Sequence, residues 1–301
     1  MQIPMKNASI IFLVLIGSLL IGAAFATPQA PNTQFNAFKV TVKGTNQQGH
    51  VLLIPGLGCS GEVWDATVQN LQNRYACHVF TLAGFAGQPA LKGATLTTIK
   101  DQIIAYIEQK KLKKVKLVGH SLGGFLALWI ASERPQLISK VVSVDGLPFL
   151  GAMQNPRATS ESNRPMAQKM KSAMLKPQPK EAAIKQQRQT LKTMISSPKY
   201  IDMVLQWNIK SDQAAVAQAM YDMYTVDLRK KIARITAPTL VMGVWWAKEY
   251  GAPIETIQQT YERQIKNIPH HQFLMHKKAK HFIMYDDPAW FQAQLKKFLD
   301  Q

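Results

Sequence analysis

Short apolar runs recur along the chain and alternate with longer segments of helical periodicity. Predominantly apolar runs, typical of strands covered on both faces, lie at residues 51–54, 79–82, 115–118, 141–144 and 240–244. Residues 38–42 instead alternate apolar and polar, which indicates an edge strand. Helical patterns occupy residues 99–107, 122–133 and 288–299. This alternation predicts an α/β fold built on a doubly wound, mostly parallel sheet.

The alternation stops between residues 147 and 235. That region is rich in Gln, Lys and Met, with helical spacing around Met166, Met170 and Met174 and again around Met220 and Met223. We expect an all-helical insertion over residues 148–235, between two parts of one core at 27–147 and 236–301. Methionines at this spacing usually fill a core, although their adaptable thioethers also suit apolar clefts.

The first residues have the pattern of an export signal. Lys6 precedes an apolar stretch at residues 10–21, and Ala24, Phe25 and Ala26 follow it. This order predicts a signal peptide over residues 1–26, cleaved after Ala26, and a periplasmic or secreted protein. An uncleaved membrane anchor is the alternative, but the apolar stretch is short for a span of about 20 residues.

The chain is strongly basic, with 36 Lys and Arg against 18 Asp and Glu and a formal net charge of +18. The basic residues are scattered rather than gathered on one element among aromatic residues, so we expect no specific nucleic-acid partner. Peripheral attraction to anionic envelope surfaces, or solubility alone, accounts better for this charge. The sequence leaves the oligomeric state open.

Cys59 and Cys77 are the two cysteines of the chain. An even count in an exported protein favours a disulfide between them, with two buried thiols as the alternative. No metal site is expected, because two cysteines at this spacing lack a nearby pair of histidine ligands.

Residues 115–124 read VKLVGHSLGG, a strand followed by G-x-S-x-G and then by an apolar helix. In this nucleophile elbow the turn is so tight that side chains at Gly119 and Gly123 would collide with neighbouring backbone. Ser121 then sits at a helix N-terminus, whose N–H groups can stabilise a developing oxyanion. Residues 38–299 thus resemble the α/β-hydrolase superfamily, in particular its lid-bearing serine esterases and lipases.

The resemblance implies an α/β-hydrolase fold whose helical insertion forms a lid, with Ser121 as the nucleophile. It also implies an oxyanion hole made by the backbone N–H groups of Leu122 and Leu57. Leu57 lies in the loop at residues 54–61, which is similar to the family's His-Gly loop but has Pro55 in place of the histidine. No metal or cofactor is needed for this chemistry.

A serine nucleophile needs a histidine to take its proton and a carboxylate to orient that histidine. Residues 280–288 read KHFIMYDDP and resemble the family's last loop, in which a His-Phe pair precedes the closing helix. His281 is therefore the predicted base.

Two carboxylates compete for the place of the acid. The usual family site follows the strand at residues 240–244, where Glu249 is the only carboxylate nearby. Asp145 ends the strand at residues 141–144, one strand after the elbow, where some members of the family carry the acid. We expect Asp145 to be the acid, with Glu249 as the alternative. If Asp145 has no catalytic role, it is a cap that orders the turn after its strand.

These residues predict hydrolysis of an ester-type acyl bond in a small molecule through an acyl-enzyme intermediate. Related triad chemistries remain open, namely those of a thioesterase, lactonase, amidase or cofactor-free peroxidase. A non-catalytic binding protein that keeps the fold is the alternative from another class. Trp245 and Trp246 are candidates for lining the substrate cleft.

Overall fold

The computed structural model describes residues 35–301 except 154, 246–247 and 249–250. The predicted signal peptide, residues 1–26, lies outside the described residues. A seven-stranded sheet has the order β1-β3-β2-β4-β5-β6-β7, in which β1 is antiparallel to β3 and the other neighbours are parallel. The strands are β1 Phe38–Gly44, β2 His50–Ile54, β3 Ala76–Leu82, β4 Val115–His120, β5 Ile138–Val144, β6 Thr239–Val244 and β7 His271–His276.

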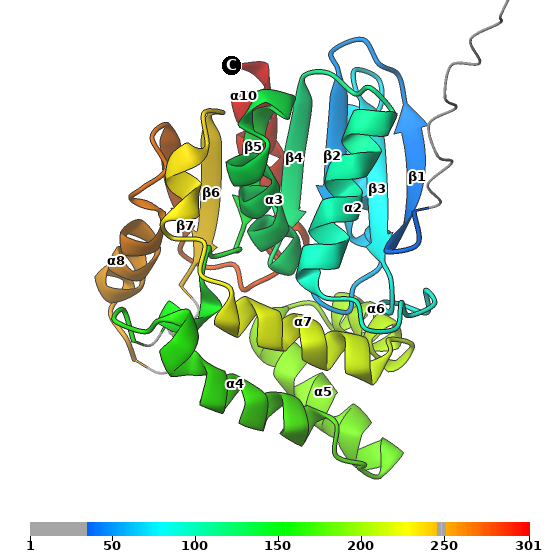
Figure 1. The fold of residues 1–301 in the computed structure, drawn as a ribbon, viewed down its shortest axis with the longest axis vertical. Coiled ribbons are helices and arrows are strands. Elements are labelled where there is room, and N and C mark those ends of the chain that lie inside the picture. The colour runs from blue at the N-terminus through cyan, green and yellow to red at the C-terminus, as the bar shows by residue number, and fades with distance from the viewer. Residues whose placement is uncertain (1–34, 154, 246–247, 249–250) are drawn as a thin grey trace, which may run out of the picture. The chain divides into compact units, whose positions relative to one another are not determined.

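Helices cover both faces of the sheet because successive strand residues point to opposite sides. On β2, Leu52 and Ile54 pack with α2 (Leu96–Gln109) and α3 (Leu122–Glu133), whereas Val51 and Leu53 pack on the opposite face. That second layer contains α1 (Asp65–Leu71) and α10 (Pro288–Asp300), while α8 (Ile254–Ile265) lies beside β6 and β7 (Figure 1). The predicted α/β architecture is confirmed.

Among the described residues, four α-helices lie between β5 and β6, within the range predicted for the insertion. We call them the cap: α4 Ser160–Met174, α5 Lys180–Met194, α6 Pro198–Ile209 and α7 Gln213–Thr225. Helix α4 packs on α7 and α5 packs on α6, and the cap lies across the carboxyl end of the parallel strands (Figure 1). Parallel α/β sheets bind ligands at this end.

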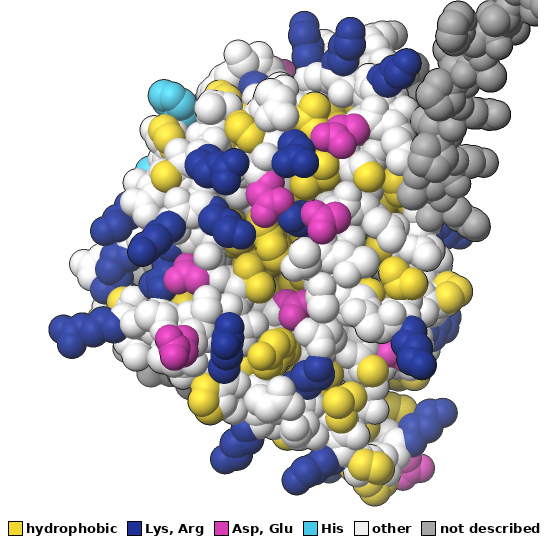
Figure 2. Space-filling view, viewed as in Figure 1, with side chains coloured by type: hydrophobic (Ala, Val, Ile, Leu, Met, Phe, Trp, Pro, Cys, Tyr) yellow, Lys and Arg dark blue, Asp and Glu magenta, His cyan; other side chains and the backbone are white. Residues whose placement is uncertain are grey.

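Lysine and arginine side chains spread over the face seen in Figure 2, without gathering into one patch. In the part of the chain that the structure describes, no helix is both long and apolar enough to cross a membrane.

Cys59 and Cys77 are free thiols, so the predicted disulfide is wrong. Each is buried in the apolar layer under α1 and α10, where its Sγ contacts a nearby backbone carbonyl, at 3.5 Å from Leu57 O and at 3.7 Å from Tyr75 O. Burial raises the pKa of the Cys59 thiol to about 12 and that of the Cys77 thiol to about 11. The two side chains therefore act as small apolar groups of the core.

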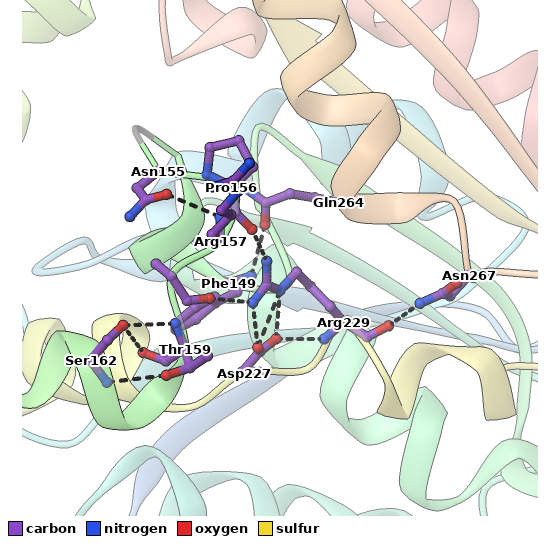
Figure 3. Close-up of polar contacts among 11 residues, drawn as sticks. Phe149, Asn155, Pro156, Arg157, Thr159, Ser162, Asp227, Arg229, Gln264 and Asn267 are labelled. Atoms are coloured by element: carbon purple, nitrogen blue, oxygen red, sulfur yellow. Dashed lines mark hydrogen bonds and ion pairs between the residues drawn. The ribbon is translucent and has the colours of Figure 1, made fainter.

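Arg229 ties the two ends of the cap together (Figure 3). Its guanidinium donates to the carbonyls of Pro156 and Ala158, at 2.9 and 2.6 Å, and forms an ion pair with Asp227 at 2.7 Å. Asn267, which follows α8, donates in turn to the carbonyl of Arg229 at 2.7 Å. The segment that leads into α4 is thereby held against the segment that follows α7.

We expect Arg229→Met to lower the free energy of unfolding by about 2 kcal/mol, because it leaves the carbonyl of buried Ala158 and the partly buried Asp227 carboxylate without their donor. Denaturant unfolding measures this loss. The matched control is Arg188→Met in the cap, whose ion pair with Asp202 is about half exposed and should contribute under about 1 kcal/mol. Equal losses in the two variants would contradict the anchoring role of Arg229.

Candidate active site

Ser121 occupies the turn between β4 and α3, with a positive φ of 54°. Its N–H donates to Val144 O at 2.8 Å. A Cβ on Gly119 would lie 2.0 Å from Gly123 O, and one on Gly123 would lie 2.1 Å from Ile54 O. Only glycine fits these two positions, so the backbone crowding expected from the G-x-S-x-G pattern is present and lifts Ser121 above the strand ends.

Asp145 and His281 meet at the carboxyl end of the sheet. Asp145 follows β5 in a left-handed conformation, with φ of 50°, and its N–H donates to Met242 O at 2.7 Å. The Nδ1 of His281 donates to Oδ2 of Asp145, whose side chain is 8% exposed. A buried carboxylate in this position fixes the tautomer and the ring orientation of the imidazole.

Ser121 lines the same cavity as Asp145 and His281. Within the described residues its hydroxyl forms no hydrogen bond with His281. In a free enzyme this contact is often long and tightens only when substrate is bound.

Tyr261 is a further residue of the site that the sequence did not predict. This buried tyrosine of α8 donates its hydroxyl hydrogen to Oδ1 of Asp145 and accepts from the N–H of Val244 at 3.3 Å. Burial and the neighbouring Asp145 carboxylate raise the pKa of Tyr261 well above its ordinary value, so the phenol stays a donor. An aromatic residue on a helix carries no local signal for this role.

His120 is hydrogen-bonded to the loop that carries His281, the predicted base. Its Nε2 donates to the carbonyl of His281 at 3.1 Å, and the two rings lie 4.6 Å apart. Full burial and the nearby His281 lower the pKa of His120 well below its ordinary value, so its imidazole is neutral.

The two predicted oxyanion donors are the residue that follows Ser121 and a residue of the loop after β2. Leu122 is the first residue of α3, and Leu57 lines the cavity. In the described part of the chain neither backbone N–H has an acceptor. The loop that carries Leu57 is held by a bond from Gly61 N to Thr81 Oγ1 at 2.9 Å and by one from Ser211 of the cap to Gly58 O at 3.3 Å.

The cavity over Ser121 has a volume of about 1250 Å³. Core and cap share its apolar wall, with side chains such as Phe125, Leu147, Met174, Ile184, Leu191, Met220 and Met223. The cap methionines at 174, 220 and 223 thus face the cleft, whereas Met166 is 45% exposed.

Trp245 lines the cavity and donates its indole N–H to Ala252 O at 2.8 Å. Trp246 and the alternative acid, Glu249, lie outside the described residues. The expectation for Glu249 therefore stays a prediction.

Comparison with known proteins agrees with this architecture. A pimeloyl-(acyl-carrier protein) methyl ester esterase from Aliivibrio fischeri is 24% identical over 259 residues, which are 83% of this chain and 93% of that protein. The structure of a hydrolase from Pseudomonas aeruginosa superposes with a TM-score of 0.73 at 18% identity, over 91% of this chain and all of that one. An enol-lactonase from Burkholderia xenovorans gives a TM-score of 0.70 at 16% identity, over 88% and 96% of the two chains.

At this identity the structural similarity establishes the fold. The profile of the alpha/beta hydrolase fold matches residues 49–288, a span that contains the elbow, the cap and the loop of His281. The chain belongs to the α/β-hydrolase fold family.

Proposed function

We propose that this protein is an exported serine hydrolase that cleaves small carboxylic esters through a Ser121–His281–Asp145 triad. The observation that carries the proposal is the hydrogen bond from His281 to the buried Asp145, at the wall of the cavity that Ser121 lines. A histidine oriented by a buried carboxylate beside a serine at an elbow is the arrangement that activates a hydroxyl for acyl transfer.

The reaction proceeds in two steps. His281 takes the proton of Ser121 as Oγ attacks the ester carbonyl, and the N–H groups of Leu57 and Leu122 stabilise the oxyanion. The carbon–oxygen bond to the alcohol then breaks, and the alcohol leaves with the proton held by His281. Water, deprotonated by His281, then attacks the acyl carbon, the bond from this carbon to Ser121 Oγ breaks, and His281 returns the proton to Oγ as the acid leaves.

Family membership and relatives named as esterases and hydrolases identify the protein as a hydrolase enzyme. The esterase relative from Aliivibrio fischeri is named for a methyl ester, which supports an ester as the bond cleaved here. Because the cap supplies much of the apolar wall of the cavity, we assign it the part of a lid over the acyl group.

A fluorophosphonate probe tests the nucleophile, because it forms a covalent adduct with an activated serine. We expect one adduct, on Ser121, and none in Ser121→Ala. For the acid, Asp145→Asn should lower kcat by about 10⁴, as loss of the correct histidine tautomer does in such triads. Glu249→Gln is the control; a large loss of kcat there, with Asp145→Asn still active, would sink the assignment.

The variant Tyr261→Phe tests whether the Tyr261 hydroxyl positions the proposed acid, Asp145. Removal of the hydroxyl leaves Asp145 with one donor fewer, so we expect kcat to fall roughly tenfold with little change in KM. Tyr106→Phe is a matched control, because Tyr106 is a buried tyrosine whose hydroxyl bonds His78 at 2.7 Å, away from the cavity. Wild-type kcat in Tyr261→Phe would contradict the positioning role.

The export part of the proposal rests on the pattern of residues 1–26. The full-length chain expressed with a secretion apparatus should reach the periplasm or the medium. N-terminal sequencing of that product should begin at Thr27. A product that retains Met1 would refute cleavage at this site.

A further inference from the structure

Lysines dominate the charged lining of the active-site cavity. Among its described lining residues, every charged side chain other than Asp145 belongs to a lysine: Lys180, Lys248, Lys277, Lys278 and Lys280. Both carboxylate oxygens of Asp145 already accept hydrogen bonds, one from His281 and one from Tyr261. No described carboxylate remains in the cavity wall to balance the lysines.

Three of these residues form what we call the lysine rim: Lys180, Lys277 and Lys278. Lys180 is the first residue of α5, and the other two follow β7 on the way to His281. All three are exposed and also line the cavity, which places them at its opening. None of the three lies within ion-pair distance of a carboxylate in the described part of the chain, although Asp287, which His276 contacts, also interacts electrostatically with Lys278.

The turn that carries Lys277 and Lys278 is held in place. The Nδ1 of His276 accepts from the N–H groups of Lys278 and Ala279, at 3.1 and 2.7 Å. The Nε2 of the same imidazole contacts Asp287 at 3.1 Å. The two lysines therefore project from a fixed backbone only a few residues before the predicted base.

The wall behind the rim is mainly apolar, although α5 also contributes Gln186, Gln187 and Thr190, and the cavity thus has two zones. An acyl chain is stabilised against the apolar zone by removal from water. Cations at the edge of a low-dielectric cleft concentrate the field there and attract anions. A ligand that satisfies both zones has an apolar middle and a negative group at one end.

We propose that the preferred substrate is an ester with an anionic group, carboxylate or phosphate, at the end remote from the scissile carbonyl. The ester lies at Ser121, the apolar part fills the cavity and the anion contacts the lysine rim. This inference rests on the proposed ester hydrolysis and adds the class of substrate to it.

The test compares pairs of esters that differ in one charge. The first pair is a mono-p-nitrophenyl dicarboxylate and its counterpart with a terminal amide; the second pair carries the same difference on the alcohol side. We expect the anionic member of at least one pair to have a kcat/KM about tenfold higher at low ionic strength. Salt should reduce this ratio, because at 0.1 M it screens charges over about 10 Å.

The double variant Lys277→Gln/Lys278→Gln should lower the ratio of anionic to neutral kcat/KM at least several-fold. The matched control is Lys110→Gln/Lys111→Gln, an adjacent exposed pair at the end of α2 that does not line the cavity. This control should keep the wild-type ratio.

A ratio near one in both pairs, with the neutral esters still hydrolysed, would overturn the anionic substrate and leave the proposed function intact. An equal fall of the ratio in the control pair would also overturn it, because net charge alone would then explain the preference. If no ester is hydrolysed and the fluorophosphonate probe does not label Ser121, both proposals fail together.

Discussion

The close approach of backbone around Ser121 is the constraint on which the rest of the site depends. Gly119 and Gly123 allow the ends of β2 and β4 to meet the start of α3 without room for a Cβ. Ser121 itself has a positive φ with ψ of −118°, a sparsely populated conformation that costs on the order of 1–3 kcal/mol and persists only where surrounding structure enforces it. The enforcement comes from α3, a helix almost wholly buried in the core.

The cap is hydrogen-bonded to the core beside the loops that carry Leu57 and His281. Ser211 contacts the loop of Leu57, and the N–H of Phe282, next to His281, donates to Met194 O at the end of α5 at 3.2 Å. On α7, Asp222 accepts from the first N–H of α2 at 2.7 Å. Motion of the cap as one body would break all of these bonds. The cap is therefore part of the framework that positions the loops as well as a cover over them.

The sequence predicted those features that depend on local pattern. Strands β1 to β6 and the elbow at Ser121 followed from periodicity and from glycine spacing, and the expectation for His281 came from the resemblance of its loop. The disulfide was wrong because an even count of cysteines carries no information about where each thiol points. The sequence pattern did not predict α5 as a separate helix within the insertion, because its residues are mostly polar and exposed. Tyr261 could not be found, because its role arises from a tertiary contact across 116 positions of the chain.

Tyr261 also gives a physical reason for proposing the acid at Asp145 rather than after β6. The Tyr261 hydroxyl accepts a hydrogen bond from the N–H of Val244, the last residue of β6. It therefore lies at the end of this strand, where the segment with the commoner site of the acid begins. From there it donates to Asp145, one strand away. Because β5 and β6 are parallel neighbours, a carboxylate at the end of either strand can reach the loop that follows β7. The phenol at the end of β6 thus supports the proposal that β5 supplies the acid.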